Sequence, residues 1–172
     1  MAHCVNHLEG IVEKFSYQPI GIIRSPFKRP EGTPIQPIGG IGVKAEVEIF
    51  PEYVEGLQDL EGFSHIILLY HCHLSQTYKL KVKPFLDDAE HGLFATRAPA
   101  RPNPIGISLV RLSRIENNTI YVQDVDIIDR TPLLDIKPFV PDFDMRTAER
   151  AGWVEKKAVN AKKVSDDGRF GN

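Results

Sequence analysis

The sequence predicts an all-β protein in which a single sheet closes fully or partly into a barrel, accompanied by short helices and a C-terminal helix. Thirteen Pro and thirteen Gly among 172 residues interrupt the chain often, which favours short strands and turns over long helices. Residues 43–49 alternate apolar and charged side chains with the period of two that is typical of a half-buried strand. Residues 65–73 are almost all apolar, as in a buried strand.

Further strands are expected where a β-branched or apolar stretch ends in a turn. The pair Asn117-Asn118 suits the tight turn of a hairpin between two such stretches. Pro and Gly within residues 27–42 favour a loop, and Pro51 is expected to open a short helix. The further strands are expected at residues 19–24, 92–97, 105–115, 120–128 and 137–140.

The length of 172 residues predicts one domain with flanking segments. Residues 1–16 are expected as an N-terminal extension, and residues 17–145 as the β-barrel domain. The composition changes at residue 146, so residues 146–172 are expected as a C-terminal helix and tail. The amphipathic pattern of residues 153–164 predicts a single helix there.

Composition excludes several classes of protein. The net charge of -2 is not that of a general nucleic-acid binder, so any RNA contact requires a local basic surface. Cys4 and Cys72 provide neither a disulfide framework nor zinc spacing, which favours a reducing cytoplasm. No apolar run approaches the roughly 20 residues that span a membrane, and residues 1–10 lack a secretory signal pattern. We therefore expect a cytoplasmic protein without a membrane partner.

Two local patterns look functional but have simpler explanations. The glycines of residues 39–42 lack the spacing of a nucleotide-binding loop and lead into a strand, so a turn is the better interpretation. His71 and His73 can share one face of a strand, but two ligands are too few for a structural zinc site. A histidine that lines a ligand pocket at the end of a strand is the preferred interpretation, and no metal is expected.

Residues 94–106 combine two arginines with three prolines. Proline fixes its own φ and restricts the preceding residue, so Asn103, which lies between two prolines, has little conformational freedom. Rigid loops often carry binding sites. A plain structural turn with solvated Arg97 and Arg101 explains the same pattern equally well.

Residues 126–138 gather three aspartates, one Arg and one Lys around an apolar centre. Asp and Thr-Pro suit a turn, and surface ion pairs would explain the charges without any function. A loop that carries carboxylates can also hold a cationic ligand such as a sulfonium.

Four ordered segments resemble the TrmO family, which is also called TsaA-like. The first is Gln-Pro-Ile-Gly-Ile-Ile-Arg-Ser-Pro-Phe-Lys at residues 18–28, and the second covers residues 57–73 with Leu-Glu-Gly-Phe-Ser-His at its centre. Residues 94–106 and 129–138 complete the set. The resemblance extends over residues 17–143, and such long matches in one order are highly specific.

The resemblance implies a β-barrel that binds S-adenosylmethionine, often as a homodimer with its sites near the subunit interface. It also implies transfer of a methyl group to N6 of N6-threonylcarbamoyladenosine in a tRNA anticodon loop. Bacterial members carry a further C-terminal domain where this chain has one expected helix. Two alternatives remain open: a module that binds S-adenosylmethionine without methylating anything, and a methyltransferase with another substrate.

Site residues follow from the same resemblance. The residues expected to bind the methyl donor are Gln36, Pro37, Ile38, His73, Leu74, Arg97, Ile107, Asp129, Arg130, Thr131 and Pro132. Asp135 is the first candidate for a catalytic base and His73 the second, because each lies in a matching motif and can accept a proton. The residues expected to contact the tRNA are Arg24, Lys28, Arg29, Arg101, Asn103 and Lys137.

Overall fold

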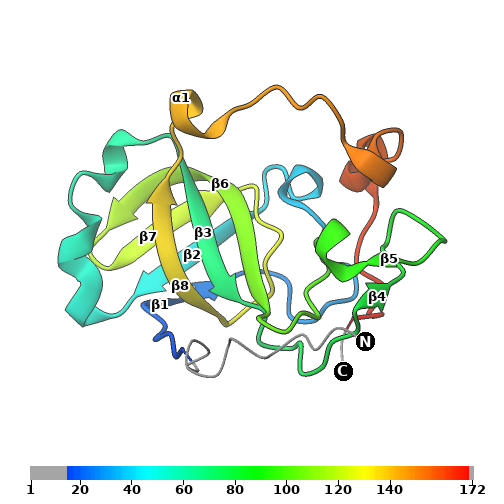
Figure 1. Ribbon diagram of the computed structural model, residues 1–172. Helices are drawn as coiled ribbons and strands as arrows, with labels where there is room; N and C mark the ends of the chain where they lie inside the picture. Colours follow the sequence, from blue (N-terminus) through cyan, green and yellow to red (C-terminus); the bar gives the residue numbers. More distant parts are fainter. Residues whose placement is uncertain (1–14, 171–172) are drawn as a thin grey trace, which may run out of the picture.

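The computed structural model describes residues 15–170, and its centre is a closed barrel of six antiparallel strands (Figure 1). The strands follow the order β1-β2-β7-β6-β3-β8 around the barrel. Their bounds are β1 (Gly21–Arg24), β2 (Lys44–Ile49), β3 (His65–His71), β6 (Ile105–Glu116), β7 (Thr119–Gln123) and β8 (Thr131–Pro138). The all-β class and the closed single sheet are thereby confirmed. Cys4 and all but residues 15–16 of the expected N-terminal extension lie outside the described residues.

Alternation along the strands fills the barrel with apolar side chains. In β2, Ala45, Val47 and Ile49 are buried, whereas the alternate residues Lys44 and Glu46 are exposed and Glu48 is half-buried. Full burial of each Val or Ile side chain contributes on the order of 1.5–3 kcal/mol. The other buried residues of this core are Ile23, Ile66, Leu68, Val110, Ile120, Val122, Val125, Ile127 and Leu133.

The hairpin between β6 and β7 forms at the expected turn. Asn117 adopts a left-handed conformation with φ of 53°, which asparagine tolerates better than most residues. The amide Nδ2 of Asn118 donates a 3.0 Å hydrogen bond to the carbonyl oxygen of Ile49 and so attaches the turn to β2. β7 ends at Gln123 instead of continuing to residue 128, because Asp124 has a φ of 68° and turns the chain back toward the barrel core.

Two of the expected strands are present only in part. Residues 92–97 form the end of β5 (His91–Gly92) and the 3-10 helix η4 (Leu93–Ala95), since Leu93 is buried and its carbonyl oxygen accepts bonds from both the amide and the hydroxyl of Thr96. Of residues 137–140, Lys137 and Pro138 are in a strand as expected, but they are the end of β8, which begins at Thr131 and pairs with both β1 and β3, and the strand stops before Phe139.

The expected helices are short and mostly of the 3-10 type. Pro51 opens η2 (Pro51–Leu57), which is followed by η3 (Leu60–Gly62), and both pack against one end of the barrel core. The single helix expected at residues 153–164 is instead η5 (Gly152–Val154) and η6 (Ala158–Lys163). The remaining helices are η1 (Pro37–Gly39) and α1 (Pro141–Asp144).

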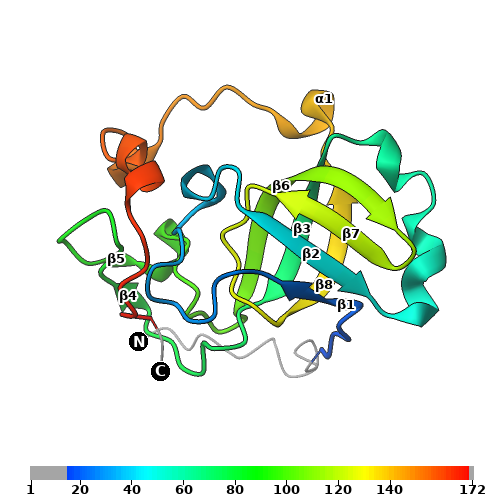
Figure 2. The same ribbon diagram turned by 180° about the vertical axis from the view of Figure 1, so that it is seen from behind.

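The C-terminal segment of residues 146–170 crosses to the far side of the molecule (Figures 1 and 2). It leaves α1, passes over the barrel end and descends beside the small sheet of β4 (Lys81–Val82) and β5. Two backbone hydrogen bonds fix it to the loop after β1, from Gly32 to Asp166 (2.9 Å) and from Asp166 to Thr33 (2.8 Å). No helix among residues 15–170 is long and apolar enough to cross a membrane.

Glycine allows the loop before β2 to approach the loop after β7. A Cβ atom on Gly40 would lie 2.2 Å from the carbonyl oxygen of Val125, so no other residue fits without a shift of the backbone. The amide of Gly42 also donates a 2.7 Å hydrogen bond to Oδ1 of Asp124. The glycines at residues 39–42 therefore form a packed turn.

Candidate active site

One cavity of about 780 Å³ opens at the end of the barrel that faces β4, β5 and the C-terminal segment. Ligand-binding pockets in proteins usually have volumes of about 300–1,000 Å³. Its walls come from the chain after β1, the end of β3, the rigid Pro-rich turn, the loop after β7 and the C-terminal segment. Of the residues expected from the sequence to form the site, those that line this cavity are Gln36, His73, Leu74, Arg97, Arg101, Ile107 and Thr131.

Arg97 is held at the cavity by one specific contact. Its guanidinium donates a 2.8 Å hydrogen bond from Nη1 to Oε1 of Gln36, and Nε2 of Gln36 donates to the carbonyl oxygen of Ile35 (2.7 Å). Arg97 follows η4, whereas Gln36 precedes η1, so the contact joins two distant segments. The exposed guanidinium retains donors that can bind an anionic group.

His73 lies just after β3 and presents a defined tautomer. The hydroxyl of Thr131 donates to the carbonyl oxygen of Ile128 (2.7 Å), so its oxygen accepts the 3.3 Å bond from Nδ1 of His73. Burial, together with the nearby His71 and Arg130, lowers the pKa of His73 below its ordinary value. His73 is therefore neutral at pH 7, with Nε2 as an acceptor.

Arg101 organises the Pro-rich turn. Its Nη1 group lies 3.0–3.5 Å from the carbonyl oxygens of Leu93, Thr96 and Ala98. The turn is also attached to β3, because the amide of Cys72 donates a 2.7 Å bond to the carbonyl oxygen of Pro104. The structure thus gives Arg101 a role in positioning the turn, while exposed Asn103 does not line the cavity.

Asp129 supports the site without lining it. Oδ1 of Asp129 accepts a 3.0 Å hydrogen bond from the amide of Ser25, and Oδ2 pairs with the ammonium of Lys28 at 2.8 Å. Although burial acts in the opposite direction, these bonds hold the pKa of the Asp129 carboxyl below its ordinary value. The other expected donor-binding residues that do not line the cavity are Pro37, Ile38, Arg130 and Pro132.

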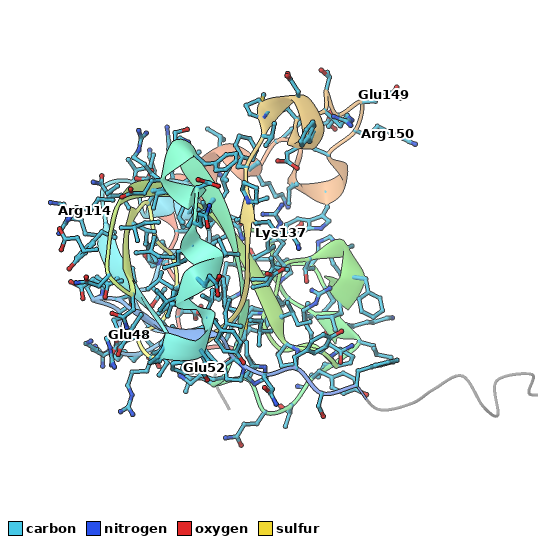
Figure 3. All side chains as sticks on the ribbon, turned by 90° about the vertical axis from the view of Figure 1, so that its left-hand side faces the viewer. Glu48, Glu52, Arg114, Lys137, Glu149 and Arg150 are labelled. Carbon is cyan, nitrogen blue, oxygen red and sulfur yellow. The ribbon has the colours of Figure 1, made fainter. Side chains whose placement is uncertain are left out.

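Asp135 and Lys137 lie on the outer wall of the barrel. Their side chains form a 2.8 Å ion pair and are 46% and 61% exposed. Asp135 lies opposite Leu69 of β3, and Lys137 lies opposite Ile67. The buried residues of β3 are the alternate ones, Ile66 and Leu68, so Asp135 and Lys137 are on the outward face of the sheet. Lys137, labelled in Figure 3, belongs to β8. The structure does not bring Asp135, the first candidate base, to the cavity of its own chain.

The three expected tRNA contacts near β1 also lie outside the cavity. Arg24 pairs with Glu48 of β2 at 2.9 Å, and Lys28 pairs with Asp129 as described above. Arg29 is exposed in the loop that follows. Arg24 and Lys28 therefore already neutralise carboxylates of the chain.

Sequence reasoning missed a polar cluster in the cavity wall. Asp126 and Tyr70 line the cavity, and both contact Ser108, which is 1% exposed. Oγ of Ser108 lies 2.6 Å from Oδ1 of Asp126 and 3.0 Å from the hydroxyl of Tyr70. The alternation along β6 could have indicated this cluster, because Ser108 is a polar residue at an inward position between the outward residues Ile107 and Leu109.

Burial alters the acidity of this cluster. Burial raises the pKa of the Asp126 carboxyl to about 6, although the hydrogen bond from Ser108 and the charge of Arg97 act in the opposite direction. Burial and the charge of Asp126 raise the pKa of the Cys72 thiol to about 11, and they raise the pKa of Tyr70 as well. Cys72 and Tyr70 are thus protonated at pH 7, and Asp126 is the acidic group that can exchange a proton there.

The cluster and the rigid turn fall within one known domain. Residues 22–145 match the family of the tRNA-methyltransferase O N-terminal domain. The chain belongs to the tRNA-methyltransferase O family.

Relatives of known structure and sequence agree with this membership. The chain is 56% identical over 154 residues to a probable S-adenosyl-L-methionine-binding protein of Pyrococcus abyssi, a match that covers 90% of this chain and 84% of the relative. It is 41% identical over 134 residues to the tRNA (adenine(37)-N6)-methyltransferase of Mus musculus, covering 74% of this chain and 31% of that protein. The crystal structure of TrmO from Pseudomonas aeruginosa superposes with a TM-score of 0.69 at 38% identity, covering 81% of this chain and 62% of the other.

The C-terminal segment contributes to the cavity although it lies beyond the TrmO domain match. Trp153, Val154, Ala158, Ala161, Asp166 and Phe170 line the cavity. The indole of Trp153 stacks on His91 at 4.5 Å between ring centroids and donates a 2.7 Å hydrogen bond to the carbonyl oxygen of Ala95. Neither the family resemblance nor the amphipathic pattern indicated this wall.

Among residues 15–170, no group of three or more His, Cys, Asp or Glu side chains gathers as a metal site would require. His71 is the last residue of β3 and His73 lies two residues further along the chain, so they provide only two potential ligands.

Proposed function

We propose that this chain is an S-adenosylmethionine-dependent methyltransferase that acts on N6 of N6-threonylcarbamoyladenosine in a tRNA anticodon loop. The observation that supports it most strongly is that three of the four TrmO-like segments, at residues 57–73, 94–106 and 129–138, contribute side chains to one cavity. The names of the mouse and Pyrococcus abyssi relatives supply the reaction class and the methyl donor.

The lining of the cavity fits the proposed donor. S-adenosylmethionine supplies a methyl group on a positively charged sulfur, along with an amino-acid end and an adenosine. Arg97 and Gln36 can hold its carboxylate, and Leu74 and Ile107 offer apolar contact to the purine. The carboxylate of Asp126 gives the cavity a negative charge that favours a cationic ligand.

The mouth of the cavity fits a single-stranded purine. Phe94 is 75% exposed on η4, and the guanidinium of Arg101 lies 5.6 Å from the centre of its ring. Bases of single-stranded RNA loops are typically recognised by stacking on such aromatic and arginine surfaces. The anticodon loop presents its bases without a duplex that must be opened.

We also propose that the chain forms a homodimer through the outer wall of β3 and β6. Ile105, Ile107 and Leu109 are 42%, 55% and 39% exposed on β6. They pair across strands with His71, Leu69 and Ile67 of β3, so one apolar stripe runs along two neighbouring strands. A second copy of the chain would cover this stripe, and Ile107, which also lines the cavity, would place the cavity near the interface.

Donor binding tests the role of Arg97. We expect Arg97→Ala to weaken binding of S-adenosylhomocysteine by about 1–3 kcal/mol, because a charge-assisted hydrogen bond to the ligand is lost. Isothermal titration calorimetry measures this directly. The control is Arg114→Ala, since Arg114 pairs with Glu116 and covers the Tyr121 ring on the distant side of the barrel (Figure 3). Equal affinity of both variants and the parent would remove Arg97 from the donor site.

Sedimentation velocity tests the dimer. We expect the parent chain to sediment as a dimer and Leu109→Lys to sediment as a monomer, because the new ammonium would have to be buried without a partner. Ile41→Lys is the matched control, since Ile41 is 72% exposed but lies outside the stripe. A monomeric parent chain would reject the proposed interface.

Methyl transfer to tRNA tests the activity. Purified protein, the donor and tRNA that carries threonylcarbamoyladenosine should yield one methylated nucleoside, 14 mass units heavier, and an equal amount of S-adenosylhomocysteine. The same tRNA without the threonylcarbamoyl group is the control and should remain unmodified. Donor binding without transfer to either tRNA would instead favour a binding module, and transfer to the control tRNA would contradict the proposed substrate.

A further inference from the structure

We infer that Asp126 accepts the proton that the target nitrogen loses during methyl transfer, from a carboxylate that Ser108 and Tyr70 hold in the cavity wall. The inference rests on the proposed function, and it names a residue that lies outside the donor-binding set expected from the family. It follows from the hydrogen-bond geometry around one half-buried carboxylate.

Ser108 fixes the orientation of Asp126. An ionised carboxylate has no proton to donate, so Oγ of Ser108 donates to Oδ1 of Asp126 across 2.6 Å. The single hydroxyl proton of Ser108 is then used, and the hydroxyl of Tyr70 must donate to Ser108 across 3.0 Å. These two hydrogen bonds hold Oδ1 of Asp126 against Ser108. The other lone pairs of the carboxylate can accept a hydrogen bond from a ligand in the cavity.

Close packing holds the backbone on both sides of this cluster. Gly40 packs against Val125, the residue before Asp126. The buried hydroxyl of Ser25 donates a 2.6 Å bond to the carbonyl oxygen of Ile127, the residue after it. On β6, a Cβ on Gly106 would lie 2.1 Å from the ring of Tyr70, so glycine provides the space that the phenol occupies. Preorganised groups of this kind accept protons without rearranging.

The groups that face Asp126 set its charge. Tyr70 and Cys72 remain protonated, so neither competes for the proton. Arg97 is the cation whose charge acts on Asp126, and neutral His73 lines the same cavity. With a pKa of about 6, the Asp126 carboxyl is mostly ionised at pH 7 and still basic enough to take a proton from an acidified amine.

The proposed step needs only the methyl donor, the target nitrogen and the carboxylate of Asp126, and these account for every bond, electron pair and proton. The bond between sulfur and the methyl carbon breaks with both electrons staying on sulfur, while the N6 electron pair forms the new bond to carbon. N6 transfers its proton to Asp126, and the carboxyl later releases that proton to water. The carbamoyl group withdraws electrons from N6 and makes this proton more acidic, so a weak base suffices.

The decisive variant is Asp126→Asn, which keeps the shape of the side chain. We expect the single-turnover rate of methyl transfer to fall about 100-fold or more, as for the loss of a general base. Affinity for S-adenosylhomocysteine, measured by calorimetry, should change less than about threefold, and the thermal unfolding midpoint should stay near that of the parent. Asp142→Asn is the control, because Asp142 is an exposed residue of α1. Its rate should equal that of the parent.

A spectroscopic measurement tests the same carboxyl without any reaction. In the protein free of ligand, carbon-detected NMR should give the Asp126 carboxyl a pKa near 6, which is above the ordinary value of an aspartate because the side chain is buried. Ser108→Ala should raise this pKa further, because the bond from Ser108 stabilises the ionised form. The rate of the parent should rise with pH through the same pKa, and in Ser108→Ala that rise should move to higher pH.

The outcomes separate this inference from the proposed function. A parent that transfers no methyl group to any tRNA contradicts the proposed function, whatever the titration shows. An active parent with an equally active Asp126→Asn overturns the inference alone. Loss of S-adenosylhomocysteine binding in Asp126→Asn would make Asp126 a donor ligand and also overturn it. A loss of rate in Asp135→Asn or His73→Gln with an intact Asp126→Asn would assign the proton to that residue instead.

Discussion

The site depends on the closure of the barrel by β8. This strand pairs with β1 on one side and β3 on the other, and without it β1 and β3 would be the two free edges of an open sheet. Closure places the loop that precedes β8 beside the end of β3, so that Thr131 meets His73 and Asp126 comes close to Tyr70 and Ser108. A closed sheet has no free edge and deforms little, which gives these loops a rigid base.

Rigidity at the barrel end comes from contacts that mostly join residues far apart in the chain. Ser25 binds both Ile127 and Asp129, and Arg97 binds Gln36 across the mouth of the cavity. The C-terminal segment adds a further wall through Trp153, which is fixed by His91 and the carbonyl oxygen of Ala95. The cavity is therefore a product of the whole chain, and its C-terminal wall lies beyond the TrmO domain that the family shares.

Local patterns made part of this structure predictable. The alternation in β2 and the Asn117-Asn118 turn depend on neighbouring residues, and both were confirmed. β8 was missed because its Pro and Asp residues favour a turn locally, whereas pairing with two strands decides its conformation. The single helix expected at residues 153–164 was wrong because Trp153 stacks on His91, whereas η6 packs against η1. Asp126 could not be singled out among three aspartates, since only the tertiary approach of Ser108 distinguishes it.

The central claim is that the cavity between the barrel end and the C-terminal segment holds the methyl donor. Hydrogen–deuterium exchange with saturating S-adenosylhomocysteine tests it most directly. The account predicts protection of the segments that contain Gln36, His73 and Arg97, together with the distant C-terminal wall around Trp153. Protection confined to the opposite end of the barrel, around Gly62 and Ile115, would contradict it.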